Sequence, residues 1–220
     1  MSFDARDPQK GPARGLLVIG GAAPGPRELL LCARGMDVVV AADSGYDHCR
    51  AAGLLPDLVV GDMDSLSDPS LLDGLPAASV MRFPRDKDET DTEIGMRLLF
   101  EKGCRELTIA GGGGGRIDHL LGVAALFERE NPPLRWLTDH EDIRLVREEA
   151  TLDGCTGATI SVFPLALGAA DMHSEGLYWP LDGLAFPRGA AGISNRAVAD
   201  RVRITVGRGR LLVIKSYPKD

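Results

Sequence analysis

Short apolar runs recur along the first two-thirds of the chain, and polar or small residues follow each of them. The runs cover 16–19, 38–41, 58–60, 79–83, 107–110 and 135–137. Continuous apolar runs of this length are typical of strands buried on both faces, as in a parallel sheet. Helical patterns separate several of the runs, so the order of elements predicts an α/β fold with right-handed crossovers.

Two segments between these runs carry clear helical signals. Thr90 and Glu93 have the spacing of a capping box, and Gly103 stands where a glycine commonly follows a helix. We therefore predict a helix over 90–102. In 116–128 the apolar residues recur with the helical period, which predicts a second helix there.

The pattern changes after about residue 140. The apolar segments become short and are separated by Gly, Pro and Asp; they cover 143–147, 159–163, 176–179, 202–206 and 211–215. Residues 202–206 alternate apolar and polar side chains, and 207–210 is predicted to turn the chain into the next strand as a hairpin. We predict a mainly parallel α/β domain over 1–140 and an all-β domain over 141–220, with the boundary near 139–142.

Composition and charge exclude several classes of protein. Of 220 residues, 44% are hydrophobic and 26% charged, which is typical of a soluble globular protein. The net charge of −7 argues against nucleic acid as a partner, because duplex binding depends on Lys and Arg. No apolar run reaches the roughly 20 residues of a membrane span, and residues 1–14 contain no signal-peptide core. The four widely spaced cysteines form no CxxC pair, so we expect reduced thiols and a cytoplasmic location.

Acidic residues gather where predicted strands end. Asp43 follows the run at 38–41, Asp62 and Asp64 follow the run at 58–60, and 86–93 holds five acidic residues. The carboxyl ends of parallel strands share one edge, so these residues are expected to meet there. Carboxylates suit Mg²⁺ together with substrate phosphates, although acids also occur in turns and at helix N-termini. Five acids exceed what a helix N-terminus needs, and their mutual repulsion favours a bound cation.

Glycines supply a second candidate site. Gly111–Gly115 precede the predicted helix that begins with Arg116, so their N–H groups could approach a phosphate closely; a flexible loop is the alternative. The segment matches neither a Walker A loop nor GxGxxG. The glycine-rich turn at 20–26 either borders the same site or is a simple loop. His119 is more typical of a helix-end hydrogen-bonding residue than of a base. Trp179 fits either the core or an aromatic wall for a flat cation.

Taken together and in order, these motifs resemble the thiamine pyrophosphokinase family. The matching segments are 42–45, 56–57, 61–65, 87–93, 114–119, 176–178 and 194–195. They extend over most of the chain. The chain departs from the family pattern in its all-glycine loop and at Arg196, where the family often has an acidic residue.

The resemblance implies a homodimeric enzyme that converts ATP and thiamine into thiamine diphosphate and AMP, by attack of the thiamine hydroxyl on the β-phosphorus. It also implies that domain 1–140 binds nucleotide and Mg²⁺ and that 141–220 is a β-sandwich that binds thiamine. The catalytic Mg²⁺ ligands carry over to Asp62, Asp64 and Asp91. ATP and phosphate contacts carry over to Asp43, Lys87, Asp88, Thr90, Gly114, Gly115, Arg116, Asp118 and His119, and thiamine contacts to Ser194, Asn195 and Trp179.

Two other functions stay open on the sequence. One is a different Mg²⁺-dependent transferase that uses a nucleotide, and the other is a non-catalytic regulator that binds a nucleotide or thiamine. The products distinguish them: AMP for diphosphate transfer, ADP for an ordinary kinase, pyrophosphate for nucleotidyl transfer, and none for a regulator.

Overall fold

The computed structural model describes residues 13–216, so almost all of the N-terminal segment 1–14, for which we expect no signal-peptide core, lies outside the described residues. The chain forms two compact units, one that ends at Gly115 and one that begins at Arg116. The predicted domain boundary near residue 140 stays a prediction. Among the described residues, no helix has both the length and the apolar character needed to cross a bilayer.

A parallel sheet forms the centre of the first unit, with the strand order β5-β1-β2-β3-β4. The strands are β1 (Ala13–Val18), β2 (Val38–Ala42), β3 (Leu58–Gly61), β4 (Val80–Arg82) and β5 (Cys104–Ala110). The chain moves outward from β1 to β4 and then returns to the other side of β1 with β5. Open parallel sheets bind ligands at the carboxyl ends of strands, next to such a change of direction.

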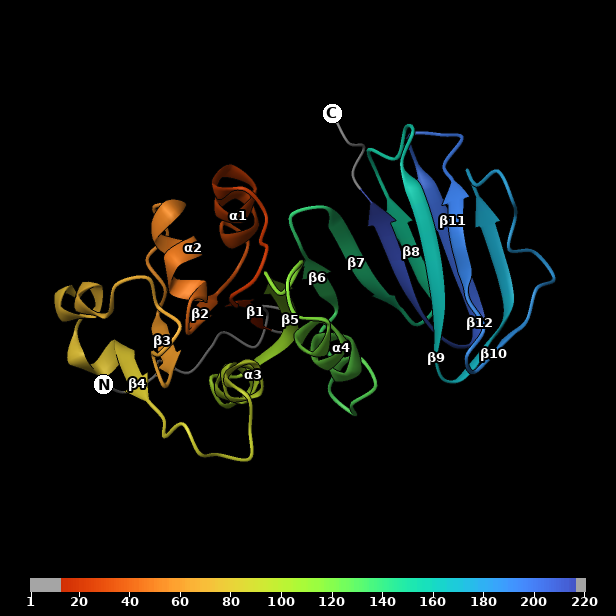
Figure 1. Ribbon diagram of the computed structural model, residues 1–220. Helices are drawn as coiled ribbons and strands as arrows, with labels where there is room; N and C mark the ends of the chain where they lie inside the picture. Colours follow the sequence, from red (N-terminus) through yellow and green to blue (C-terminus); the bar gives the residue numbers. More distant parts are fainter. Residues whose placement is uncertain (1–12, 217–220) are drawn as a thin grey trace. The chain divides into compact units, whose positions relative to one another are not determined.

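Helices cover both faces of this sheet (Figure 1). The helices α1 (Pro26–Ala33) and α2 (Gly45–Ala51) pack on one face, where Leu16 and Val18 of β1 enter the core. Leu17 points to the other face and contacts α3 (Asp91–Glu101). A Cβ at Gly95 of α3 would lie 2.4 Å from a methyl group of Leu17, so the glycine permits this close packing. Two 3₁₀ helices, Pro69–Gly74 and Ala77–Ser79, connect β3 to β4.

Both predicted helices are present. Thr90 is the N-cap of α3 and forms the expected capping box with Glu93, which confirms the start of that helix. The second predicted helix is α4 (Ile117–Leu126), with which the second unit begins.

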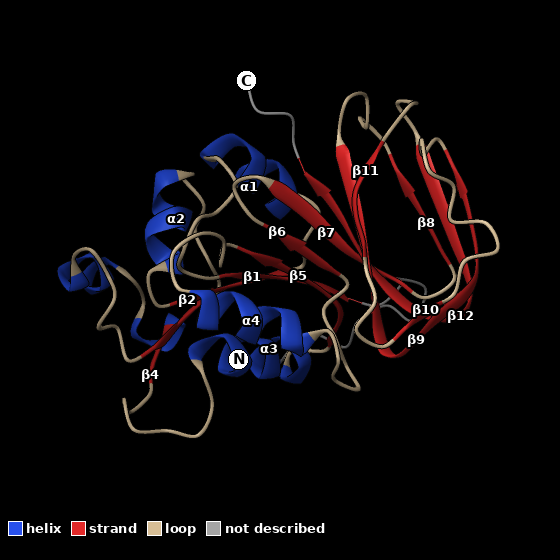
Figure 2. Ribbon diagram, turned by 45° about the vertical axis from the view of Figure 1, so that its right-hand side comes forward, coloured by secondary structure: helices blue, strands red, loops and turns tan. Residues whose placement is uncertain are grey.

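Antiparallel strands build the rest of the second unit. They are β6 (Arg135–Leu137), β7 (Glu141–Val146), β8 (Glu149–Leu152), β9 (Thr159–Glu175), β10 (Phe186–Pro187), β11 (Gly192–Arg196) and β12 (Val202–Ser216). The two long strands β9 and β12 pair along most of their length. β12 also pairs with β7 through 211–216 and with β8 through 202–205, so it contributes to both layers of the unit, as Figure 2 shows.

An apolar core lies between these layers. Val146, Ile160 and Val213 come from the strands of one layer, and Leu152 and Ile204 from those of the other. The N-terminal α/β unit and the C-terminal all-β sandwich confirm the predicted fold class.

Two glycines let the long strands bend from one layer into the other. Gly168 of β9 has φ +120° and Gly209 of β12 has φ +86°, both in the region that favours glycine. A Cβ at Gly209 would lie 2.0 Å from the carbonyl oxygen of Gly168. The register of the β9–β12 pair also shifts between Gly209 and Leu211.

Two details of the β domain differ from the sequence analysis. The hairpin at 207–210 is wrong, because β12 runs through these residues as one strand. The apolar segment 176–179 forms no strand and contributes only an isolated bridge between Leu177 and Ala197. In both places glycine produces a bend or an irregular segment, which a pattern of alternating side chains does not distinguish from a turn or a short strand.

Candidate active site

Three carboxylates from separate segments meet at the carboxyl edge of the parallel sheet. Asp43 directly follows β2, Asp62 directly follows β3, and Asp91 is the first residue of α3. One oxygen of each lies within 4.8 Å of those of the other two, and all three residues are partly buried. No other group of at least three His, Cys, Asp or Glu residues with this geometry occurs in the described residues.

Gly61 makes room for one of these carboxylates. It is the last residue of β3 and has φ +136°. A Cβ at this position would lie 2.1 Å from Oδ1 of Asp43, so a side chain here would displace the carboxylate. The same Asp43 oxygen accepts a hydrogen bond of 3.0 Å from the N–H of Met63. The end of β3 therefore both leaves space for Asp43 and holds it in place.

The pKa values of Asp43 and Asp62 shift in opposite directions. Burial raises the pKa of Asp43 to about 7, and the hydrogen-bonding contact with Asp91 and the negative charges of Asp91 and Asp62 act in the same direction. The pKa of Asp62 is instead lowered, first by the hydrogen bond that its carboxylate accepts from the N–H of Asp64 and then by nearby Lys87 and Arg85. The group therefore combines a carboxyl that holds its proton up to neutral pH with one that ionises readily.

Asp91 is held at the start of α3. Its Oδ1 is buried and accepts no hydrogen bond within the described part of the chain, while the ammonium of Lys87 lies 3.2 Å away as an ion-pair partner. Lys87 also donates a hydrogen bond of 3.1 Å to the carbonyl of Pro84. This lysine is mostly buried, with 13% of its side chain exposed, so its charge is fixed beside the carboxylate group.

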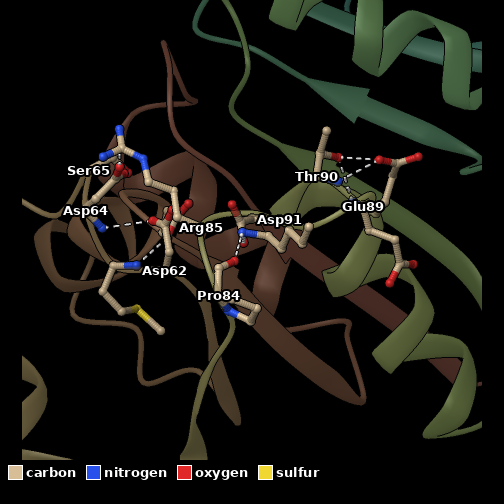
Figure 3. Close-up of polar contacts among 12 residues, drawn as sticks. Asp62, Asp64, Ser65, Pro84, Arg85, Glu89, Thr90 and Asp91 are labelled. Carbon is tan, nitrogen blue, oxygen red and sulfur yellow. Dashed lines mark hydrogen bonds and ion pairs between the residues drawn. The ribbon is translucent and has the colours of Figure 1, made fainter.

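Asp64 lies outside the group, and Figure 3 shows it beside Arg85. Its carboxylate forms an ion pair of 3.1 Å with the exposed guanidinium of Arg85, while its N–H donates to Asp62. The structure thus brings together Asp43, Asp62 and Asp91, whereas the family resemblance implied Asp62, Asp64 and Asp91 as the metal ligands. The sequence had also placed Asp43 at this edge, because it follows a predicted strand, but as a phosphate-binding residue. The roles of all four residues stay predictions.

The remaining polar residues of the acidic segment differ in their surroundings. The hydroxyl of Thr90 accepts a hydrogen bond from the N–H of Glu93 and donates one to its carboxylate, so the capping box uses it fully. Asp88 is exposed. Thr90 therefore orients the first turn of α3, which carries Asp91.

The two glycine-rich turns interlock. The N–H of Gly112 donates to the carbonyl of Gly20 at 2.7 Å, and Ala22 and Gly113 exchange two hydrogen bonds. Gly111 needs to be glycine, because a Cβ there would lie 2.2 Å from the carbonyl oxygen of Ile19. Gly114 and Gly115 follow with positive φ and are exposed. The turn at 20–22 thus supports the glycine segment.

The residues after the glycines belong to the second unit. Arg116 binds the carboxylate of Asp118 through two nitrogens, and both side chains are mainly exposed. This pairing raises the pKa of Arg116 and lowers that of Asp118. His119 is also exposed. Arg116, which we predicted to bind a phosphate, therefore binds the carboxylate of Asp118 in this structure.

In the second unit, Asn195 connects β11 to the segment that carries Trp179. Its amide oxygen accepts from the N–H of Trp179 at 3.1 Å, and its amide nitrogen donates to the carbonyl of Trp179 at 2.6 Å. Trp179 is 58% exposed and packs edge-to-face against Tyr178, with ring centroids 4.7 Å apart. The alternative that Trp179 is a core residue is therefore wrong.

Two neighbours complete this aromatic region. The guanidinium of Arg196 lies 4.2 Å from the centre of the Tyr178 ring. Ser194 has φ +60°, and its N–H donates to the hydroxyl of Ser161. The region thus offers an exposed indole, a tyrosine with one face covered by a cation, and the exposed Ser194.

Comparison with known families finds two matching models. The model described as the catalytic domain of thiamin pyrophosphokinase matches residues 31–133. The model described as its vitamin B1 binding domain matches residues 141–211.

Individual relatives agree with these matches. A thiamine pyrophosphokinase of Bacillus subtilis (strain 168) is 25% identical over 186 residues, which are 80% of this chain and 86% of the relative. The crystal structure of thiamine pyrophosphokinase from Bacillus subtilis has a TM-score of 0.77 at 23% identity and covers 94% of this chain and all of that one. The yeast thiamin pyrophosphokinase structure has a TM-score of 0.67 at 17% identity and covers 96% of this chain and 88% of that one.

Proposed function

The chain belongs to the thiamine pyrophosphokinase family, and we propose that it transfers a diphosphate group from ATP to the hydroxyl of thiamine, which gives thiamine diphosphate and AMP. The observation that carries the proposal is the group of Asp43, Asp62 and Asp91 beside the ammonium of Lys87. It lies at the edge of the sheet where open α/β folds bind their ligands.

The carboxylate group fits Mg²⁺. Carboxylate oxygens are the ligands that this ion prefers, and Mg²⁺ sites commonly use one or two of them together with substrate phosphates. The buried Oδ1 of Asp91 accepts no hydrogen bond in the described residues and has the Lys87 ammonium as its ion-pair partner at 3.2 Å. An oxygen without a hydrogen-bond donor is suited to bind a metal ion. Asp62 and Asp91 would hold the ion together with Asp43. Asp64 stays a predicted ligand, whose ion pair with Arg85 would have to open. When bound, Mg²⁺ neutralises negative charge on phosphate oxygens.

Cationic and N–H groups from several segments suit a polyphosphate. Lys87 holds a positive charge beside Asp91, and the exposed Arg85 lies two residues before Lys87. Gly114 and Gly115 follow a turn that hydrogen bonds to Gly20 and Ala22 hold in place, and their N–H groups suit an anion. We propose Arg116 as a further phosphate contact, with the loss of its bond to Asp118 as the cost of binding. Phosphoryl-type transfer depends mainly on such positioning and charge neutralisation.

We propose that Ser194, Asn195 and Trp179 bind thiamine. An exposed aromatic ring suits a flat pyrimidine or a cationic thiazolium. Because both ends of the Asn195 amide bind the main chain of Trp179, Asn195 acts by holding the indole in place. Ser194, at the surface of β11, is the hydrogen-bonding residue of the set.

The products of one reaction test the proposal. The purified chain is incubated with ATP, Mg²⁺ and thiamine, and the nucleotide products are separated by chromatography. AMP and thiamine diphosphate in equal amounts support diphosphate transfer. ADP would favour an ordinary kinase, pyrophosphate a nucleotidyl transfer, and no turnover with binding of either substrate a regulator. Size-exclusion chromatography with light scattering tests the homodimer that we also propose, and fractionation of cells tests the cytoplasmic location.

Variants of the carboxylates test the metal site. Asp62→Asn and Asp91→Asn are each expected to lower kcat by at least ~100-fold, the scale of losing a key electrostatic group. Asp73→Asn is the matched control, because it removes an exposed carboxylate from the 3₁₀ helix 69–74. Near-normal turnover of both site variants in Mg²⁺ would refute the assignment.

A further inference from the structure

The loop after β3 is connected to the beginning of α2 by hydrogen bonds at every second residue, 63, 65 and 67. The N–H of Met63 donates to Asp43, as described above. The N–H of Ser44 donates to the hydroxyl of Ser65 at 3.2 Å. Two residues further along, Ser67 binds the carboxylate of Asp47. The loop that carries Asp62 and Asp64 is thus attached at three successive points to one short segment.

The last of these ties consists of two hydrogen bonds. The N–H of Ser67 donates to one oxygen of Asp47 at 3.0 Å, and the hydroxyl of Ser67 donates to the other at 2.7 Å. Hydrogen bonds to an ionised carboxylate are shorter and stronger than bonds between neutral groups. Asp47 is partly buried in the first turn of α2, a helix that packs against β1 and β2. Its carboxylate is therefore a fixed point for the loop.

The loop needs such a fixed point because its own backbone is irregular. Met63 has φ +66°, which is uncommon for a residue other than glycine, and no helix or strand begins until Pro69. The side chains of Met63 and Leu66 enter the core, while Asp62 reaches the carboxylate group. Hydrogen bonds at both Met63 and Ser67 fix residues 63–67. They thereby also fix Asp62, which directly precedes Met63.

We propose that Asp47 is a positioning residue for the metal site: through Ser67 it holds the loop so that Asp62 stays beside Asp43 and Asp91. Asp47 is not a member of the carboxylate group and accepts its two hydrogen bonds from Ser67, so its effect is transmitted by the loop. The inference rests on the proposed function, because that function makes the carboxylate group a binding site for Mg²⁺.

The chain contains a matched control for this tie. Asp68 also accepts hydrogen bonds from the N–H and the hydroxyl of a serine, Ser70, at 3.0 and 2.7 Å. These bonds close a local turn at the start of the 3₁₀ helix and do not connect the loop to α2. Asp68→Ala therefore removes one carboxylate and the same two kinds of bond, while the two hydrogen bonds between Ser67 and Asp47 stay in place.

The experiment measures binding of Mn²⁺, as a paramagnetic substitute for Mg²⁺, to the full chain by electron paramagnetic resonance. Asp47→Ala is expected to raise the Kd about 10-fold, the lower end of the effect of residues that orient metal ligands. Asp68→Ala should leave the Kd within about two-fold, since its bonds are local. Asp47→Asn, whose amide oxygen still accepts from Ser67, should recover most of the affinity. Ser67→Ala, which keeps the main-chain bond, is a milder variant should Asp47→Ala fail to fold.

Kinetics supply a second measurement. The Mg²⁺ concentration that gives half-maximal activity should rise in Asp47→Ala, whereas kcat at saturating Mg²⁺ should stay close to that of the unaltered chain. Equal Mn²⁺ affinity in Asp47→Ala and the unaltered chain, or equal losses in Asp47→Ala and Asp68→Ala, would overturn the inference alone. Failure of the unaltered chain to bind Mn²⁺ would overturn the proposed metal site and this inference with it.

Discussion

The raised pKa of Asp43 predicts that the contribution of this residue to the stability of the metal-free protein falls as the pH rises. In the folded chain burial and the neighbouring carboxylates disfavour the ionised form of Asp43, which shifts its pKa from 3.8 to about 7. The folded state therefore binds this proton more tightly than the unfolded state. Its contribution to stability is fully present below pH 3.8 and is lost progressively as the pH rises to about 7.

The size of the pKa shift of Asp43 sets the largest loss of unfolding free energy that its ionisation can cause. It spans about three pKa units, and each unit corresponds to about 1.4 kcal/mol, so the largest possible loss is about 4 kcal/mol. Asp43 is only partly buried, and solvent screening reduces such a value, so we expect a loss of about 2 kcal/mol.

Asp43→Asn isolates this contribution. The amide has the shape of the carboxyl and carries no charge, and its oxygen can still accept the hydrogen bond from Met63. The variant should match the unaltered chain near pH 4 and exceed its unfolding free energy by about 2 kcal/mol at pH 8. Urea unfolding followed by circular dichroism, from pH 4 to pH 8 with chelator present, measures the difference. Asp73→Asn controls for the loss of one negative charge.

Added Mg²⁺ should reverse the order. An ion that binds only the folded state stabilises it in proportion to its affinity, and the unaltered chain offers it one carboxylate more. The unaltered chain should then be the more stable of the two at pH 8. A stability difference between the variant and the unaltered chain that does not change from pH 4 to pH 8 in chelator would refute the reasoning about Asp43.

Three further substitutions test other parts of the site. Gly61→Ala would place a Cβ 2.1 Å from Asp43 at a residue with positive φ, so thermal unfolding should show a loss of stability of about 1–3 kcal/mol. Gly53→Ala is the control with a smaller expected loss, because φ is also positive there but no atom lies within 4 Å of the Cβ. Arg116→Ala should raise the KM for ATP more than that for thiamine in steady-state assays; equal changes would favour a surface role. Asn195→Ala should raise the KM for thiamine, leave that for ATP largely unchanged and alter the indole fluorescence, because Trp179 loses two main-chain partners. Unchanged fluorescence would contradict the holding role.

The sequence predicted the elements whose signals are local. Buried parallel strands leave continuous apolar runs, and the capping box at Thr90 and Glu93 marks the start of α3 within one residue. The sandwich was harder, because β9 and β12 each extend over both layers. The bend at Gly209 depends on a close approach to Gly168, which is a contact across strands and not a property of either segment.

In the candidate site, too, local signals could be read from the sequence, and contacts between distant residues could not. Each acidic segment could be found from its position after a strand, but the choice between Asp43 and Asp64 depends on where each side chain points. Asp43 turns inward because Gly61 leaves space and Met63 donates a hydrogen bond, whereas Asp64 turns toward Arg85. These are contacts between residues about 20 positions apart, and spacing along the chain does not encode them.

The central place of β12 in the second unit has a consequence for how the chain is made. β7, β8 and β9 all pair with this strand, and β10 and β11 pair with β9. A ribosome synthesises β12 after all of them, so β7, β8 and β9 lack this shared partner until the last part of the unit has been made. The first unit contains parallel strands and helices that are complete before residue 116. We expect the nascent chain to fold in two stages, with the sandwich closing only once residues 202–216 have left the exit tunnel.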